Sequence, residues 1–513
     1  MTVTNVLIPL VALVSAYAYL TRKPSSGLPK PPGPKPLPLV GNILNLTTHQ
    51  LWLRVTDWSM TYGKVIYVHV FGQGLVFLST AEACIDLLDK RGSIYSDKPH
   101  LVMCGELCGC ENMAAFTSYG DQMRRQRKLM QRALGPTAIP KYHSLLEMET
   151  PWFLKRLLEN PEDYITPIRR YAGGMTLLVV YGYQVKSDDD TFLQLADHCI
   201  DLLANEIASG GGIWPVDIFP ALRRLPEWMP GAGFLKKARA WRAKIEELVD
   251  KPYEFVQESL RKGIALPSFC STLLEENEAQ DAQGDFDLRW TANSMYTGSI
   301  DTTMTLVLQF FLAMIEHPEA MKKAQKEIDS VVGNDRLPTF ADRENLPYLE
   351  ALFNECLRYG VGVPLSLPHR LMEDDIYEGM FIPKGSLVFA NVWNILRDET
   401  MFKDAHLFKP ERYLEPVDEE TAKRRDPKNY SFGFGRRICP GRYLVQSSAW
   451  ILMASLLATM DISKAVDANG KQIEPEVKYE NSIFRMPSKL QMNIKPRSER
   501  AVGIIDELTN GQQ

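Results

Sequence analysis

The segment Phe432–Gly441, with the sequence FGFGRRICPG, lies directly before an apolar helical pattern over residues 443–460. Its three glycines let the backbone approach a flat partner closely, and Pro440 suits the first turn of a helix. Cys439 is therefore expected at a helix N-terminus, where backbone N–H groups and the helix dipole lower the pKa of a thiol. With two arginines beside it, this cysteine is better interpreted as a metal ligand or nucleophile than as an inert core residue.

The same segment resembles the haem-binding signature F-x-x-G-x-R-x-C-x-G of the cytochrome P450 family. Its fixed positions are filled by Phe432, Gly435, Arg437, Cys439 and Gly441. The resemblance implies that Cys439 is the proximal thiolate ligand of haem iron and that Arg437 pairs with a haem propionate. The phenylalanine and the two glycines then belong to the cofactor-binding loop.

Two upstream motifs are similar to the same family. Glu355 and Arg358 lie in a helical pattern at i,i+3 and share one face, as in the family's E-x-x-R motif. Pro410–Tyr413, with the sequence PERY, is similar to the P-E-R-F motif. The resemblance implies that Glu355, Arg358 and Arg412 form a structural triad that supports the loop carrying Cys439.

A long helical pattern from about residue 288 to 316 carries an acid beside a hydroxyl, Asp301-Thr302. Reductive activation of O2 needs protons without bulk water, and a hydroxyl backed by a carboxylate is a minimal relay. The segment resembles the family's [AG]-G-x-[DE]-T motif, which implies that Thr302 is the oxygen-side hydroxyl and Asp301 the proton-relay acid. Ser299 departs from the pattern, which has glycine there.

Further cofactor and substrate residues are implied by the resemblance. Arg127 and Arg370 are expected on haem propionates, although Met123 stands where the family has a tryptophan and cannot donate a hydrogen bond. Substrate is expected to meet mainly apolar residues, which favours a lipophilic molecule such as a terpenoid or polyketide. These residues are 101–116, Tyr296, Ile300, 363–367 and 483–484.

Composition excludes several classes of protein. The 513 residues are 45% hydrophobic and 24% charged, which is ordinary globular usage. A net charge of −5 argues against a nucleic-acid partner. The 8 cysteines are too sparse for a disulfide framework and are expected to be reduced.

The N-terminal region predicts a membrane anchor. Residues 6–20 carry no charge, span roughly 22 Å as a helix, and are followed by Arg22 and Lys23. Positive charge on that flank favours a cytosolic C-terminal side, in preference to a cleaved signal peptide, whose charge precedes the apolar run. We expect an anchor over 1–23, a stiff proline-rich spacer over 24–40 and a single haem-thiolate catalytic domain over 41–513, on the cytosolic face of the endoplasmic reticulum.

The body is predicted to be mainly α with small β-sheets, as in the P450 fold. A β-hairpin is expected over 65–79 around Gly72–Gly74, followed by a helix with Ser79 and Glu82 as its capping box. A second hairpin is expected over 376–391 around Pro383–Gly385, and residues 275–285 are expected to be loose.

The hypothesis is a microsomal monooxygenase that holds heme b. Electrons would come from NADPH through the flavins of NADPH–cytochrome P450 reductase, with cytochrome b5 as a further donor, docked on cations including Arg125 and Lys128. The sequence of residues 364–393 is similar to that of fungal enzymes of the O-methylsterigmatocystin oxidoreductase type. Two alternatives stay open: a haem-thiolate isomerase or peroxygenase, and a non-enzymatic metal-binding protein built on Cys104, Cys108 and Cys110, which lack a fourth ligand nearby.

Overall fold

The computed structural model describes residues 27–47, 49–207, 214–276, 281–479 and 483–511. The α-helices are α2 (Leu51–Tyr62), α3 (Ala81–Cys84), α4 (Gly92–Tyr95), α5 (Asp121–Leu134), α6 (His143–Glu159), α7 (Ile165–Tyr181), α8 (Thr191–Asp201), α9 (Pro215–Ile218), α10 (Gly233–Arg261), α11 (Phe269–Glu275), α12 (Ala282–Glu316), α13 (Pro318–Val331), α14 (Pro347–Gly360), α15 (Val392–Ile395), α16 (Glu419–Arg425), α17 (Lys428–Ser431), α18 (Arg442–Thr459) and α19 (Glu499–Asn510). The strands are β1 (Val65–Val70), β2 (Gln73–Leu78), β3 (His369–Arg370), β4 (Asp375–Tyr377), β5 (Met380–Ile382), β6 (Leu387–Ala390), β7 (Met460–Lys464) and β8 (Met492–Pro496). Short 3₁₀ or π-helical turns include η2 (Val102–Leu107), η7 (Pro220–Arg224), η9 (Pro410–Tyr413) and η10 (Gly435–Arg437).

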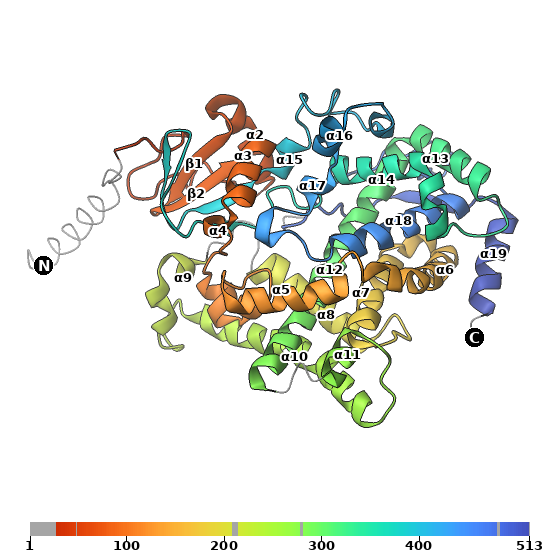
Figure 1. Cartoon of the computed structure of the whole chain (residues 1–513), viewed down its shortest axis with the longest axis horizontal. Coiled ribbons are helices and arrows are strands. Elements are labelled where there is room, and N and C mark those ends of the chain that lie inside the picture. Colours follow the sequence, from red (N-terminus) through yellow and green to blue (C-terminus); the bar gives the residue numbers. More distant parts are fainter. Residues whose placement is uncertain (1–26, 48, 208–213, 277–280, 480–482, 512–513) are drawn as a thin grey trace, which may run out of the picture.

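Helices dominate the molecule, which confirms the predicted mainly α class. Figure 1 shows β1 and β2 with α2 and α3 at one end, while helices fill the rest. The largest apolar core lies among the helices, and two smaller cores lie around the β-rich end. Helix α12 passes between the others and packs against α7, α5, α10, α14 and α18.

Helix α12 begins earlier than the sequence pattern indicated. The Asp281 side chain caps it by accepting a 2.7 Å hydrogen bond from the amide of Gly284, so part of the segment expected to be loose is helical. The helix ends before His317-Pro318 as predicted. Among the described ranges, α12 alone is long and apolar enough to cross a membrane, but 78% of its most apolar window is buried in the protein. It is a core helix.

The predicted anchor over 1–23 lies outside the described residues. The described part of the proline-rich segment has no helix, and its carbonyl groups accept hydrogen bonds from the β-rich end. Tyr67 donates its amide to Pro32 at 3.0 Å, and Phe381 donates its amide to Pro29 at 2.8 Å. The segment is therefore fixed to the β-rich end along this length.

The first predicted hairpin is confirmed with a shifted turn. Val70 pairs with Gln73, so the turn is Phe71-Gly72, and both residues have positive φ, at 47° and 88°. Parallel pairing joins β6 to β2, and β3 completes the sheet order β1-β2-β6-β3. The predicted cap at Ser79 is wrong by one residue, because the Thr80 hydroxyl accepts the hydrogen bond from Ala83.

The second predicted hairpin has the wrong turn. Strands β4 and β5 pair across Glu378-Gly379, where both residues have positive φ. Pro383–Gly385 instead leads from β5 into β6, which belongs to the larger sheet. Two glycine-containing turns lie six residues apart, and only tertiary pairing decides which of them closes the hairpin.

Candidate active site

Cys439 lies on a tight loop between η10 and α18. Its amide donates to the Phe432 carbonyl at 2.8 Å. Gly435 has φ +55°, and a Cβ added there would lie 2.1 Å from the Leu88 carbonyl oxygen, so the position admits only glycine. Gly441 caps α18, and an added Cβ would meet Cys439 Sγ at an ordinary 3.9 Å. The loop conformation thus depends sterically on Gly435.

The electrostatics of Cys439 differ from the sequence expectation. Burial raises the pKa of this thiol above its ordinary value, although amide hydrogen bonds from Gly441 and Arg442 and the charges of Arg127 and Arg442 act in the opposite direction. The expected lowering by the helix N-terminus is therefore present but is outweighed by burial. The amides are placed to stabilise a thiolate that gains a cationic partner such as a metal ion.

The predicted propionate-binding arginines lie around this loop. Arg437 donates to the backbone carbonyls of Ser96 and Thr117, each at 2.7 Å. Burial lowers its pKa to about 10. Arg127 donates to the Ile438 carbonyl at 2.8 Å, and burial lowers its pKa as well.

Arg370 forms an ion pair with Asp97 at 3.1 Å, next to Ser96, whose carbonyl accepts from Arg437. Met123, the departure from the family pattern, is buried with 3% exposure.

Lys98 is a buried cation that sequence reasoning missed. It is 5% exposed and donates to the Leu367 and Pro368 carbonyls at 3.2 and 3.1 Å. Burial, and then the charge of Arg437, lowers its pKa to about 7. Nothing in its local sequence separates it from a solvated lysine. Buried cations bonded to carbonyls suit an anionic group, so the donor set fits a haem with two propionates.

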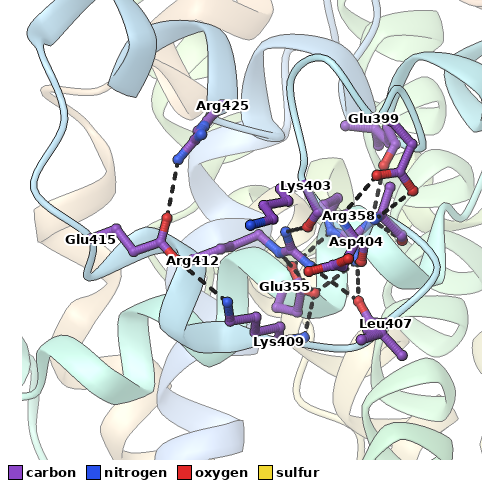
Figure 2. A network of polar contacts seen from close by, with 12 residues as sticks. Glu355, Arg358, Glu399, Lys403, Asp404, Leu407, Lys409, Arg412, Glu415 and Arg425 are labelled. Atoms are coloured by element: carbon purple, nitrogen blue, oxygen red, sulfur yellow. Dashed lines mark hydrogen bonds and ion pairs between the residues drawn. The ribbon is translucent and has the colours of Figure 1, made fainter.

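The predicted triad is brought together in the structure and forms a buried network (Figure 2). Arg358 binds both carboxylate oxygens of Glu355 at 2.8 and 2.7 Å, and Arg412 reaches the same carboxylate at 3.2 Å. The two arginines also donate to carbonyls of residues 403–407. Helix α14, which carries Glu355, packs against α17 and α18 on either side of the Cys439 loop. The network is therefore connected to that loop through the helices that flank it.

Asp301 and Thr302 lie on a stripe in the middle of α12 that is not fully buried. Gly298 is exposed, whereas most of the helix beyond residue 302 is buried. Thr302 donates its hydroxyl to the Gly298 carbonyl at 2.9 Å, and Ser299 donates to the Tyr296 carbonyl at 2.8 Å. The added hydroxyl of Ser299 is thus bound to its own helix.

Two residues predicted over the haem are on the wrong face of α12. The Tyr296 hydroxyl donates to the Phe192 carbonyl at 3.0 Å, and its ring packs edge-on against Tyr181. Ile300 is 1% exposed and lies 3.4 Å from a Cβ placed on Gly173 of α7. Ser294, Gly298 and Thr302, spaced at i, i+4 and i+8, form the open face instead.

Ala114 connects the two halves of the site. Its carbonyl accepts a 3.3 Å hydrogen bond from Arg437, and its amide donates to the Ser294 hydroxyl at 3.0 Å. The cysteine loop and the open face of α12 therefore lie on either side of this one residue.

A cavity of about 360 Å³ lies along the segment between η2 and α5. Leu101 and Phe116 line it, as expected of a substrate-facing segment, but Glu111, Asn112 and Gln122 line it too. This cavity is more polar than the predicted apolar pocket. Val102, Met103 and Cys104 of the same segment are in the core.

The metal-binding alternative is contradicted. Cys104, Cys108 and Cys110 are buried, and the part of the chain that the structure describes contains no group of three or more His, Cys, Asp or Glu side chains arranged to hold a metal ion. Burial, followed by the neighbouring Cys110 and Asp217, raises the pKa of Cys108 to about 12, so it is a core thiol.

The cations expected at a docking surface are partly neutralised. Arg125 forms an ion pair with Asp287 of α12, whose side chain is 4% exposed, and Arg124 pairs with Asp121 at 2.5 Å. Lys128 is exposed, and no ion pair joins it to any described residue.

Comparisons with known proteins agree with this geometry. The model of the family "Cytochrome P450" matches residues 31–493. Cytochrome P450 monooxygenase claT of Ampulloclitocybe clavipes is 40% identical over 501 residues, which cover 97% of this chain and 97% of that protein. Cytochrome P450 monooxygenase 208 of Postia placenta is 40% identical over 503 residues, covering 98% of this chain and 96% of that protein. The chain belongs to the cytochrome P450 family.

Membership and the names of these fungal relatives define the class of enzyme. It is a P450 monooxygenase, an oxidoreductase that incorporates oxygen from O2, and the family implies a haem group. The family generally uses a redox partner and a small-molecule substrate. The narrower resemblance to O-methylsterigmatocystin oxidoreductase stays a prediction.

Proposed function

We propose that this enzyme inserts one oxygen atom from O2 into a lipophilic small molecule, such as a terpenoid or polyketide, with electrons from NADPH delivered by a flavin-containing cytochrome P450 reductase. The balanced reaction is RH + O2 + 2 e⁻ + 2 H⁺ → ROH + H2O. The observation that carries the proposal is the pair of hydrogen bonds at Ala114, which join Arg437 beside the thiol to Ser294 on the open face of α12.

The residues around Cys439 would hold heme b. The thiolate would be the iron ligand, and Arg437, Arg127 and Arg370 would pair with propionates, with Lys98 as a fourth cation. When bound, the haem supplies the iron on which O2 is reduced. Glycine at 435 keeps the loop tight, and the amides of Gly441 and Arg442 hold the negative charge on sulfur.

On the other side of the site, α12 would supply protons. Thr302 presents a hydroxyl whose hydrogen bond to Gly298 fixes its rotamer, and Asp301 lies next to it at the edge of the open face. A carboxylate and a hydroxyl in sequence would pass two protons to reduced oxygen, while the buried stretch of α12 over residues 303–315 excludes water.

The enzyme would be held on the cytosolic face of the endoplasmic reticulum by the anchor predicted over residues 1–23. Exposed apolar side chains support contact with a membrane, because Leu44, Phe219 and Trp228 are 79%, 54% and 81% exposed. The Phe219 ring packs edge-on against Phe71 of the β1–β2 turn, with ring centroids 6.0 Å apart. Cytochrome b5 would be a further electron donor.

Reduction by two routes under carbon monoxide tests the proposal. NADPH with purified reductase is expected to give the same red-shifted Soret band as dithionite, and terpenoids or polyketides offered under ¹⁸O2 are expected to give singly labelled products. A band with dithionite but none with NADPH and reductase, together with turnover driven by hydrogen peroxide, would instead identify a peroxygenase.

A further inference from the structure

A strained valine follows helix α14. Val361 has φ 35° and ψ 84°, in the left-handed region, where a β-branched residue is an outlier. It is 2% exposed. Its neighbours Gly360 and Gly362 both lack the positive φ that glycine would accept without cost. Backbone strain of this kind persists only where the surroundings hold it.

The two glycines are explained by close packing on α12. A Cβ added to Gly360 would lie 3.0 Å from the Cβ of Gln309, and one added to Gly362 would lie 3.4 Å from the Thr305 methyl group. Thr305 is one turn beyond Asp301 and donates its hydroxyl to the Asp301 carbonyl at 2.7 Å. Residues 360–362 therefore rest directly on α12 beyond the acid and hydroxyl pair.

Arg485 binds the backbone on both sides of Val361. Its guanidinium donates to the Gly360 carbonyl at 2.6 Å, and its amide donates to the Gly362 carbonyl at 2.8 Å. Its own carbonyl accepts a 2.8 Å hydrogen bond from Gln309 of α12. The side chain is buried, and in the described ranges no carboxylate forms an ion pair with it.

An aromatic ring connects the same arginine to the next residues of the chain. The guanidinium lies 4.8 Å from the ring centroid of Trp393, whose amide donates to the Pro364 carbonyl at 3.1 Å. Ser366 is a second non-glycine residue with positive φ, at 55°, and its hydroxyl accepts from the Ala390 amide at 3.2 Å. Positive φ thus occurs near both ends of the segment 361–366.

We propose that Arg485 is a positioning residue that holds Val361 in its left-handed conformation and so fixes residues 363–367 relative to α12. The inference rests on the proposed function and on the sequence-based expectation that residues 363–367 and 483–484 face the substrate. A guanidinium that binds the backbone between these segments sets their separation, and therefore the width of the pocket beyond the haem.

The test compares two iron-binding probes on the full-length haem protein by their Soret shifts. Imidazole reports the iron alone, whereas 1-dodecylimidazole also places a long chain along the pocket wall. Arg485→Met removes a hydrogen bond from a charged donor, so the Kd for 1-dodecylimidazole is expected to rise about tenfold. The Kd for imidazole and the reduced carbon monoxide band are expected to stay unchanged.

Arg397→Met is the matched control. Its guanidinium also stacks on Trp393, at 3.2 Å, but donates to the Tyr359 carbonyl at 2.9 Å and not to Gly360 or Gly362. It is expected to leave both Kd values within about twofold of the parent.

A double-mutant cycle with Val361→Gly identifies the target of Arg485. Glycine adopts the left-handed conformation unaided, so in the V361G background Arg485→Met is expected to change the Kd for 1-dodecylimidazole by less than about twofold. If Arg485→Met does not accumulate as a haem protein, Arg485→Lys enters the same cycle.

Three results would overturn the inference: parent-like binding of 1-dodecylimidazole by the arginine variant, equal weakening of both probes, or a tenfold effect that persists in the V361G background. A parent protein without any Soret shift on adding imidazole would instead contradict the proposed function.

Discussion

The Cys439 loop and the open face of α12 are held by different kinds of constraint. In the loop, the backbone is so close that a Cβ added to Gly435 would lie 2.1 Å from the Leu88 carbonyl oxygen. Only glycine fits there, and the loop has one conformation. The backbone of α12 has the same helical geometry on all sides. Which of its side chains face the site therefore depends on which sides pack against neighbouring helices. A sequence motif therefore specifies a loop residue by residue, whereas it specifies a helix only up to rotation about its axis.

The loop half of this comparison is tested most severely by Gly435→Ala. Its Cβ would collide with a backbone oxygen, so the variant is expected to lose haem binding almost completely. Gly433→Ala is the matched control, because Gly433 has φ +78° but nothing within 4 Å of an added Cβ. That control is expected to cost only about 1–2 kcal/mol of stability. Haem content per protein and the unfolding midpoint are measured for both variants. Equal losses of haem and stability would show that the positive φ, and not the contact with Leu88, requires glycine at position 435.

The support beneath the loop is tested by Glu355→Ala. The change leaves Arg358 and Arg412 buried without their carboxylate, which is expected to cost about 3–5 kcal/mol in the free energy of unfolding. Glu350→Ala is the control, since its pairs with Lys428 and Arg343 are partly exposed and are expected to contribute about 1 kcal/mol or less. Urea unfolding followed by circular dichroism measures both. A small effect of Glu355→Ala would remove the network from the support of the loop.

The α12 half is tested by Thr302→Ala. Loss of the hydroxyl on the open face is expected to lower the product formed per NADPH several-fold, with the missing electrons recovered as hydrogen peroxide, because proton delivery fails while haem binding persists. Thr291→Ala is the control, since Thr291 makes the same hydrogen bond to the carbonyl four residues earlier but is fully buried. An unchanged ratio of product to NADPH in Thr302→Ala would mean that the hydroxyl is structural.

The docking cations give a smaller effect that depends on salt. Lys128→Glu is expected to slow reduction by the reductase about two- to fivefold at low ionic strength, with the difference shrinking as salt is added. Arg125 is unsuitable for this test because its reversal would leave the buried Asp287 without its partner. Lys471→Glu, an exposed lysine between β7 and β8, is the control. Stopped-flow rates that are equal for both variants across the salt series would exclude Lys128 from the docking surface.

The smallest expected effect is a gain in stability. The Tyr413 hydroxyl is buried and finds no hydrogen-bond partner among the described residues. The family's motif has phenylalanine at this position, and Tyr413→Phe is expected to stabilise the protein by about 1 kcal/mol. A lower melting temperature in this variant would show that the hydroxyl does have a partner, such as a bound water.

Sequence patterns predicted those parts of the structure that depend on short-range geometry. The placement of Cys439 before α18, the β1–β2 hairpin and the end of α12 follow from glycine spacing, strand alternation and a proline. The inward face of α12 does not, because Tyr296 is apolar enough for either environment and only its packing against α7 settles its direction. The sequence also did not predict the burial of Lys98 or the strained backbone at Val361, since segments distant in the chain impose both.

In the proposed function, Cys439 supplies a thiolate to the haem iron. The most direct measurement is the reduced carbon monoxide difference spectrum of Cys439→Ser beside that of Cys356→Ser, a buried cysteine of α14 outside the site. Cys356→Ser is expected to keep the red-shifted Soret band that a thiolate ligand gives, whereas Cys439→Ser is expected to lose it. Retention of that band in Cys439→Ser would show that Cys439 is not the iron ligand.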